Sequence, residues 1–340
     1  MAKLKVTLKD ISQRTGFDKS TISRVLRNDS TLSIRQENVD RIKQVAREMN
    51  YVPDAAGRSL RSARSFSIGA LVPSLQNQVH AQIVEGAAEA CRRRGYSLII
   101  AQAAEGKQQM DVIHDMVERN RVDGLLALTF RTEYSLMKTM PQFDVPVMAV
   151  NWRAEGFANW VAANEQAGSR LITQSLIDLG HTKIAHISGD PERFNPSERL
   201  SGYRDALDSA GIAFDPDLVE RGGYSFDEGA EAMNALLDRR GGDFTAVYVL
   251  SILSAAGALS ALKKRNIAVP QDISMVSFHD TLMGRIMSPS LTTVAYPLIQ
   301  MGEIAATGLM DILDGKFETF THTVDDFRLL QGESSAARRS

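Results

Sequence analysis

Several features that define other classes of protein are missing from this 340-residue sequence. Its one cysteine, Cys91, excludes an intrachain disulfide and every two-cysteine metal motif. No apolar run approaches the roughly 20 residues that span a bilayer, and the N-terminal Met-Ala-Lys-Leu-Lys-Val has no apolar signal core. We therefore expect a cytoplasmic protein that does not contact the membrane.

Motifs for catalysis and for metal binding are missing as well. His181, His186, Ser188 and Asp190 lie close together, but residues 179–187 have the pattern of a helix end followed by a buried strand. No Gly-x-Ser-x-Gly elbow and no cluster of metal ligands accompanies them. We predict that the protein is not an enzyme and has no catalytic residue, no cofactor and no metal site.

The charge that is present is unevenly distributed. The chain has a net charge of −2, yet residues 1–64 hold fourteen Lys and Arg against seven Asp and Glu, which leaves 25 against 34 in the remainder. The first part is therefore +7 and the rest is −9. A basic head on an acidic body indicates a polyanionic partner for the head, and charge alone fits RNA, DNA or a membrane surface.

Residues 7–28 contain two short helical patterns on either side of Gly16. Thr7 and Asp10 suit the start of the first helix, and Asp18 suits the start of the second. The second helix has an apolar side and a polar side, and the polar side carries Lys19, Ser20, Ser23, Arg24 and Arg27. This predicts a helix-turn-helix whose second helix lies in a major groove, so the pattern selects duplex DNA. A generic pair of amphipathic helices is the alternative.

The next 40 residues add a third helix and a linker. Apolar residues at helical spacing predict a helix that ends near Met49 and completes a small three-helix core. Residues 54–61 resemble a short helix, but Gly57 and the lack of apolar surface make it too weak to form alone. We expect this segment to order only against another surface, with residues 62–65 as the linker to the body.

From residue 66 onward, strand patterns alternate with helical patterns. The predicted strands cover residues 66–72, 96–101, 124–128, 145–151, 184–188, 246–250 and 273–278. The predicted helices include residues 79–94, 165–179, 197–210 and 252–265. This alternation predicts an α/β body with two parallel sheets and a ligand cleft at the carboxyl ends of their strands.

The motifs in both parts, taken in order, resemble the LacI/GalR family of bacterial transcription regulators over nearly the whole chain. They include Val6-Thr-Leu-Lys-Asp-Ile-Ser, Thr21-Ile-Ser-Arg-Val-Leu, Asn50-Tyr-Val-Pro, Arg58-Ser-Leu, Ile68-Gly-Ala-Leu-Val-Pro, Val122-Asp-Gly-Leu-Leu, Leu179-Gly-His-Thr-Lys-Ile-Ala-His-Ile, Glu198-Arg-Leu-Ser-Gly-Tyr, Val269-Pro-Gln-Asp-Ile-Ser and Pro289-Ser-Leu-Thr-Thr-Val. Each block alone is weak evidence, whereas their order and spacing make the resemblance specific.

The resemblance implies a repressor that binds a near-palindromic operator as a homodimer and responds to a small-molecule effector. The head would be residues 1–53, a hinge helix and linker residues 54–65, and the effector-binding and dimerisation domain residues 66–340. By the same resemblance, the body is like a periplasmic binding protein. Its N-subdomain would hold residues 66–161 and 292–321, and its C-subdomain residues 162–291 and 322–340.

The resemblance also implies a set of DNA contacts. Lys19 and Ser20 would read bases, and Leu60 of the hinge would insert between base pairs in the minor groove. The full set is Thr7, Lys19, Ser20, Thr21, Ser23, Arg24, Asn28, Tyr51, Arg58 and Leu60. The tail from Gln331 lacks the leucine heptads of a tetramerising coil, so a dimer is favoured over a tetramer.

Effector contacts carried over by position lie at the predicted strand ends. They are Ser74, Leu75, Phe130, Arg131, Asn151, Arg199, Phe226 or Tyr224, Ser251, His279 and Tyr296. The chain departs from the sugar-binding pattern, because Ser251-Ile252 and Phe278-His279-Asp280 replace segments in which many members have more carboxylates.

Because carboxylates accept hydrogen bonds from sugar hydroxyls, their loss argues against a neutral sugar bound in the usual way. Arg199 with His279, Arg131 or Arg153 could receive a carboxylate or phosphate. We therefore expect an anionic effector, such as an anionic sugar derivative, or a heteroaromatic one. The alternatives are that His279 is an interior histidine, that Arg199 is an ion-pair partner, or that the cleft is specialised for an unusual sugar or is nearly silent.

We considered two rival functions. Some members of the family answer to a partner protein instead of a small molecule, and the sequence does not separate these two. A stand-alone solute-binding protein would need an export signal and would not need residues 1–64, so the sequence opposes it.

Substitution of Lys19 tests the assignment of the base readers. Lysine donates to guanine O6 and N7, so Lys19→Ala should relax the sequence preference, whereas Arg24→Ala should weaken binding evenly across sequences. Selection of binding sites from a random duplex pool measures both effects. An unchanged motif with Lys19→Ala would show that the assignment is wrong.

Overall fold

The computed structural model describes residues 6–26, 29, 31–51, 64–102, 107–119, 121–128 and 144–338. Internal contacts divide the chain into two units, residues 1–64 and 65–340. Among the described residues, no helix is long and apolar enough to cross a membrane. The hinge segment predicted at residues 54–61 lies outside the described residues, as does residue 28.

The first unit is the predicted three-helix head. Its helices are α1 (Leu8–Thr15), α2 (Lys19–Leu26) and α3 (Gln36–Glu48). Thr7 and Asp10 form a capping box at the start of α1, and an Asp18 carboxylate oxygen accepts a hydrogen bond from the Thr21 N–H at 2.9 Å. Ile11, Ile22 and Ile42, one from each helix, are fully buried. Because each helix contributes a side chain to this core, the head folds around its own apolar centre.

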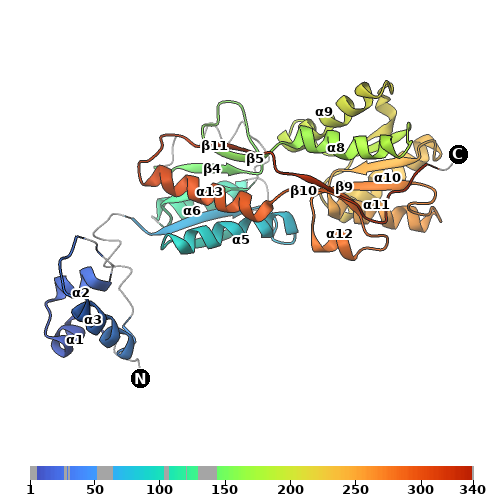
Figure 1. Ribbon diagram of the computed structural model, residues 1–340. Helices are drawn as coiled ribbons and strands as arrows, with labels where there is room; N and C mark the ends of the chain where they lie inside the picture. Colours follow the sequence, from blue (N-terminus) through green and yellow to red (C-terminus); the bar gives the residue numbers. More distant parts are fainter. Residues whose placement is uncertain are drawn as a thin grey trace. The chain divides into compact units, whose positions relative to one another are not determined.

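The second unit contains two six-stranded sheets that form two lobes (Figure 1). The first sheet, in the order β11-β5-β4-β3-β1-β2, consists of β1 (Ser67–Val72), β2 (Ser97–Gln102), β3 (Gly124–Ala127), β4 (Val147–Val150), β5 (Trp160–Ala163) and β11 (Thr321–Val324). The second, in the order β12-β10-β9-β8-β6-β7, consists of β6 (Ile184–Ser188), β7 (Val219–Arg221), β8 (Ala246–Val249), β9 (Ser274–Phe278), β10 (Thr292–Ala295) and β12 (Arg328–Leu330). All ladders are parallel except that between β10 and β12.

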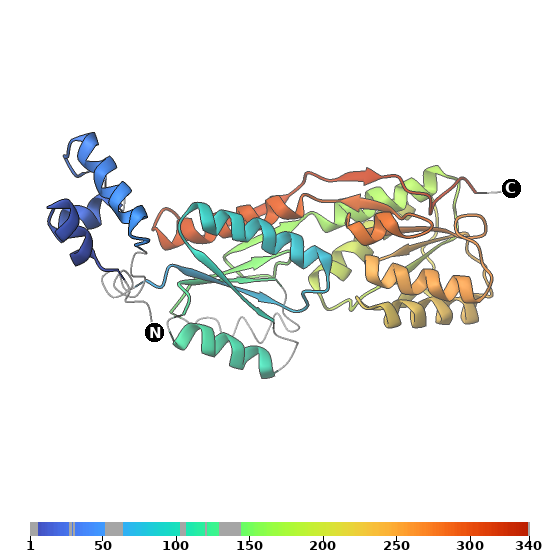
Figure 2. The same ribbon diagram turned by 90° about the horizontal axis from the view of Figure 1, so that it is seen from below.

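Helices cover both faces of each sheet. In the first lobe, α5 (Gln78–Arg93) and α13 (Leu298–Leu313) lie on one face and α6 (Lys107–Glu118) lies on the other, as Figure 2 shows. In the second lobe, α8 (Glu165–Asp178) and α9 (Phe194–Ser209) lie opposite α10 (Phe226–Arg240) and α11 (Ile252–Lys264), and the short α12 is Leu282–Ile286. Strands buried on both faces explain the nearly continuous apolar runs in β3, β4 and β8.

The crossings between the lobes differ from the predicted boundaries at two places. We expected the chain to return to the first lobe at residue 292 and to leave it at 321. Instead, β10 pairs with β9 of the second sheet, so the return comes after Ala295, and β11 pairs with β5 of the first sheet, so the last crossing follows Val324. β10 is buried in its ladder, whereas three of the four residues of β11 are exposed, and the sequence pattern alone did not reveal the partners of either strand.

Two glycines allow α5 and α13 to cross closely. A Cβ atom at Gly302 would lie 1.9 Å from the backbone oxygen of Ile83, and one at Gly86 would lie 1.8 Å from the backbone oxygen of Ile299. These distances are shorter than any van der Waals contact, and the clashing atoms are backbone atoms that cannot rotate away. The helix pair therefore depends on glycine at both positions.

Substitution at the crossing tests this dependence. Gly302→Ala should force the two backbones apart and lower the free energy of unfolding by about 1–3 kcal/mol, despite the higher helix propensity of alanine. Thr307→Ala is the matched control, because Thr307 is exposed on the same helix. Thermal unfolding of the two variants provides the comparison, and equal melting temperatures would contradict the packing argument.

Candidate functional site

The predicted DNA-contacting residues of the head lie around the start of α2. Lys19 and Ser20 are exposed in its first turn, and Thr7 is exposed before α1. This leaves the first turn of α2 accessible to a base edge, as the helix-turn-helix prediction requires. Tyr51 is partly buried and packs against the head core, and Ser23 is half-buried. Asn28, Arg58 and Leu60 lie outside the described residues.

Arg24 has partners within the head. Its Nε lies 2.8 Å from an Asp29 carboxylate oxygen, and its Nη2 donates to the Thr31 hydroxyl at 2.8 Å. Hydrogen bonds from Thr31 and from Arg24 hold the pKa of Asp29 well below its usual range. In the head, Arg24 is therefore part of an ion pair with Asp29, and its contact with a phosphate stays a prediction.

A second candidate site is a cavity of about 400 Å³ in the body. Its walls come from the segments that follow β1, β4, β6, β8 and β9, so both sheets direct the carboxyl ends of their strands at it. The volume falls in the range of small-molecule sites. The structure thus has a cavity of ligand size where the sequence predicted a cleft, at the carboxyl ends of the strands of both sheets.

Two residues of the cavity wall have strained backbones. Asn151 directly follows β4 with a φ of 67°, and His279 directly follows β9 with a φ of 72°. Residues with a Cβ rarely adopt this left-handed conformation, and the strain costs of order 1–3 kcal/mol. One such residue on each sheet, both lining the same cavity, indicates a functional site.

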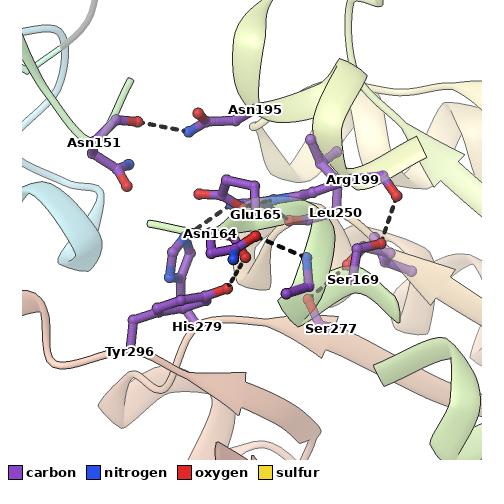
Figure 3. A network of polar contacts seen from close by, with 12 residues as sticks. Asn151, Asn164, Glu165, Ser169, Asn195, Arg199, Leu250, Ser277, His279 and Tyr296 are labelled. Carbon is purple, nitrogen blue, oxygen red and sulfur yellow. Dashed lines mark hydrogen bonds and ion pairs between the residues drawn. The ribbon is translucent and has the colours of Figure 1, made fainter. Parts of the chain in front are cut away.

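A buried ion pair forms the inner end of the cleft (Figure 3). Arg199 of α9 is 1% exposed and Glu165 of α8 is 0% exposed, and the Arg199 Nε donates to the Glu165 carboxylate at 2.6 Å. The guanidinium also donates to the Leu250 backbone oxygen and lies 3.9 Å from the centre of the Phe278 ring. Arg199 is therefore neutralised inside the protein.

The position of Arg199 fixes the proton of His279. The Arg199 Nη2 lies 3.0 Å from His279 Nε2, and a guanidinium only donates, so Nε2 accepts and the ring proton is on Nδ1. Burial, and then the charge of Arg199, lower the pKa of His279 well below its usual value. His279 is therefore a neutral imidazole.

Some buried polar atoms of the cavity walls have no hydrogen-bond partner among the described residues. They include His279 Nδ1, a donor, and the side-chain oxygens of Asn151 and Asn195, both acceptors. The Asn195 Nδ2 donates to the Asn151 backbone oxygen at 3.0 Å, which fixes the orientation of its amide across the cleft. Buried groups of this kind are costly unless a ligand or water completes them.

The structure brings together part of the predicted effector set. Ser74, Asn151, Arg199, Ser251 and His279 line the cavity. Two of these have local roles, because the Ser251 hydroxyl caps α11 and the Ser74 hydroxyl accepts from the Gln76 N–H.

Three of the predicted effector residues do not line the cavity. Leu75 and Phe226 are 46% and 44% exposed. Of the alternatives Phe226 and Tyr224, only Tyr224 lines the cavity. The Tyr296 hydroxyl donates to the Asn164 backbone oxygen at 2.7 Å, and its ring packs against Phe278 and Phe327. Leu75, Phe226 and Tyr296 are thus not among the wall residues of this cavity, and their contact with an effector stays a prediction. Phe130 and Arg131 lie outside the described residues.

Other wall residues were missed by the sequence analysis. Trp152, Phe194 and Asn195 line the cavity, and Glu165 supplies the counter-charge behind it. The helix predicted to start at residue 197 begins at Phe194, which brings Phe194 and Asn195 to the cleft. Trp152 could have been predicted, because it follows the carboxyl end of β4, where ligands bind in such folds. No local pattern in the sequence identified Glu165.

Both units of the chain match known protein families. Residues 7–54 match the family described as bacterial regulatory proteins, lacI family, and residues 173–335 match a periplasmic binding protein-like domain. The ribose operon repressor of Escherichia coli (strain K12) is 32% identical over 301 residues, which are 88% of this chain and 90% of that protein. The HTH-type transcriptional repressor PurR of Histophilus somni (strain 2336) is 30% identical over 300 residues, 87% of this chain and 89% of that protein.

A solved structure is similar over nearly the full length. The transcriptional regulator CelR in complex with cellobiose is 28% identical, with a TM-score of 0.75, and the match covers 97% of this chain and 100% of that one. The head and the two-sheet body agree with these relatives. The chain therefore belongs to the LacI family of bacterial regulatory proteins, as a DNA-binding transcriptional repressor controlled by a small-molecule effector.

Proposed function

We propose that the effector is a neutral, polyhydroxylated molecule of the sugar class, bound in the 400 Å³ cavity. The observation that carries this proposal is the Arg199–Glu165 ion pair. An anionic effector would need an uncompensated cation at the inner end of the cleft, and Glu165 already compensates Arg199. This replaces our expectation of an anionic effector, which depended on Arg199 and His279.

Arg153 also entered that expectation and has partners too, whereas Arg131 lies outside the described residues. The Arg153 guanidinium lies 3.5 Å from a Glu198 carboxylate oxygen and 5.4 Å and 5.0 Å from the ring centres of Trp160 and Phe194. His279 is neutral and adds no charge. The described cations that suggested an anion are thus neutralised or engaged.

The atoms without partners match hydroxyl groups. A sugar hydroxyl both donates and accepts, so one ligand can donate to Asn151 and Asn195 and accept from His279 Nδ1. Trp152, Phe194 and Tyr224 add aromatic surface to the walls, which suits the apolar face of a sugar ring. The names of the ribose operon repressor and the CelR–cellobiose complex agree with this class.

We propose that the protein acts in the cytoplasm as a homodimer. The edge strand β2 exposes Ile99 and Ile100 at 37% and 45%, and α12 exposes Leu282 and Ile286 at 64% and 72%. Apolar side chains on an edge strand are a liability unless another chain covers them. A second copy would cover these side chains and place a second head on the other half of a near-palindromic operator.

The effector proposal is tested by thermal-shift measurements with neutral sugars, sugar phosphates, sugar acids and nucleobases. We expect stabilisation by one or more neutral sugars, and loss of at least tenfold in affinity for that sugar with Asn195→Ala, because one hydrogen-bonding group is removed. Ser201→Ala, on a helix position outside the cavity, is the control. Stabilisation only by sugar phosphates or sugar acids would overturn the proposal.

Glu165→Gln tests whether the ion pair sets the charge of the cleft. The variant leaves a buried guanidinium uncompensated and should lose about 3–5 kcal/mol of stability. Added phosphate should bind beside Arg199, where the carboxylate is lost, and should raise the melting temperature of the variant part of the way to that of the wild type. It should have little effect on the melting temperature of the wild type. Equal effects of phosphate on the two proteins would show that Glu165 does not neutralise Arg199 in solution.

A further inference from the structure

The segment that enters the body from the DNA-binding unit is held by one carboxylate. Asp123 lies directly before β3, and its Oδ1 accepts from the Ser65 N–H at 2.6 Å and from the Ser65 hydroxyl at 2.8 Å. Its Oδ2 accepts from the Phe66 N–H at 2.8 Å. The first two residues of the second unit thus share one carboxylate.

Further contacts connect this point to the first sheet. The Asp123 N–H donates to the Ser67 backbone oxygen at 2.8 Å, and the Ser97 N–H donates to the Phe66 backbone oxygen at 2.9 Å. The Phe66 ring lies 5.6 Å from the Tyr96 ring. Residues 65–67 are therefore fixed to β3 and to the start of β2, as well as continuing into β1.

Phe66 adopts a conformation that needs this support. Its φ is 54°, in the left-handed region that residues with a Cβ rarely enter. Such a conformation persists only where the surroundings impose it. The hydrogen bond from the Phe66 N–H to Asp123 and that from Ser97 to the Phe66 oxygen hold both peptide groups of this residue.

We propose that Asp123 is a positioning residue for operator recognition: it sets the direction in which the chain leaves the first sheet toward the hinge and the head. With the carboxylate in place, residues 65 and 66 move with the sheet, so a displacement of the sheet reaches the point where the chain leaves it. Without the carboxylate, Phe66 relaxes to an extended conformation, and residues 65 and 66 must be ordered again when specific DNA binds. This inference rests on DNA binding and not on the identity of the effector.

Asp123→Asn tests the proposal with little change in shape. The amide keeps one acceptor in place of two, and its NH₂ group faces N–H donors. Ordering one backbone residue on binding costs roughly a factor of ten in the equilibrium constant, so we expect about tenfold weaker binding to a duplex selected by the wild type. Binding to a scrambled duplex should stay within about twofold, because it depends mainly on phosphate contacts. Asp144→Asn, an exposed carboxylate shortly before β4, is the matched control.

A second pair of variants approaches the same point from the linker. Phe66→Pro removes the N–H donor and forbids a positive φ, whereas Phe66→Asn keeps both the donor and access to the left-handed region. We expect Phe66→Pro to reproduce the loss seen with Asp123→Asn, and Phe66→Asn to stay within about threefold of the wild type. Fluorescence anisotropy with the selected and scrambled duplexes, together with thermal unfolding and sedimentation, gives the readouts.

The outcomes separate this inference from the functions on which it depends. A positioning role is supported if affinity for the selected duplex falls in the variants while three quantities stay unchanged. These are the affinity for the scrambled duplex, the mass of the dimer and the melting temperature. A wild type that selects no sequence would instead refute the assignment as a sequence-specific regulator. Equal affinities of Asp123→Asn and wild type, or of Phe66→Pro and Phe66→Asn, for the selected duplex would overturn the positioning role. Parallel loss of both kinds of DNA binding with a lower melting temperature would also overturn it, because the carboxylate would then serve only the fold.

Discussion

The buried ion pair between Arg199 and Glu165 constrains the whole second lobe. Two charges removed from water cost several kcal/mol each unless hydrogen bonds satisfy them. Here α9 supplies the cation, α8 the anion, the end of β8 a backbone oxygen, and the residue after β9 an imidazole. These four elements must therefore keep their relative positions for the pair to remain compensated.

The same pair sets the chemistry of the cleft. Its geometry makes His279 a neutral donor at Nδ1, and Glu165 compensates the positive charge of Arg199. What remains is a cavity with unsatisfied donors and acceptors and with aromatic walls. Strained backbones at Asn151 and His279 place these groups where they face the cavity. One ion pair thus connects four elements of the second lobe and lies beside the cavity.

Charge has a different role in each unit. The head has an excess of lysine and arginine and an exposed first turn of α2, which suits contact with polyanionic DNA. The body is acidic, and its ion pairs are mostly internal to one lobe. The two units are joined at a point where Asp123 accepts hydrogen bonds from the backbone of Ser65 and Phe66. The polyanion partner and the small molecule thus bind to separate parts of one chain.

The sequence by itself determined the fold class, the helix-turn-helix and seven of the strands, because these depend on local periodicity, caps and continuous apolar runs. It did not reveal β7 or β12, which have three residues each and are too short to show a period. Nor did it assign β10 and β11 to their sheets, because strand pairing joins residues far apart in sequence. The motifs identified Arg199 and His279 as cleft residues. Only the tertiary structure decided that Glu165 neutralises Arg199, since the charge available to a ligand depends on which side chains meet in a buried, low-dielectric space.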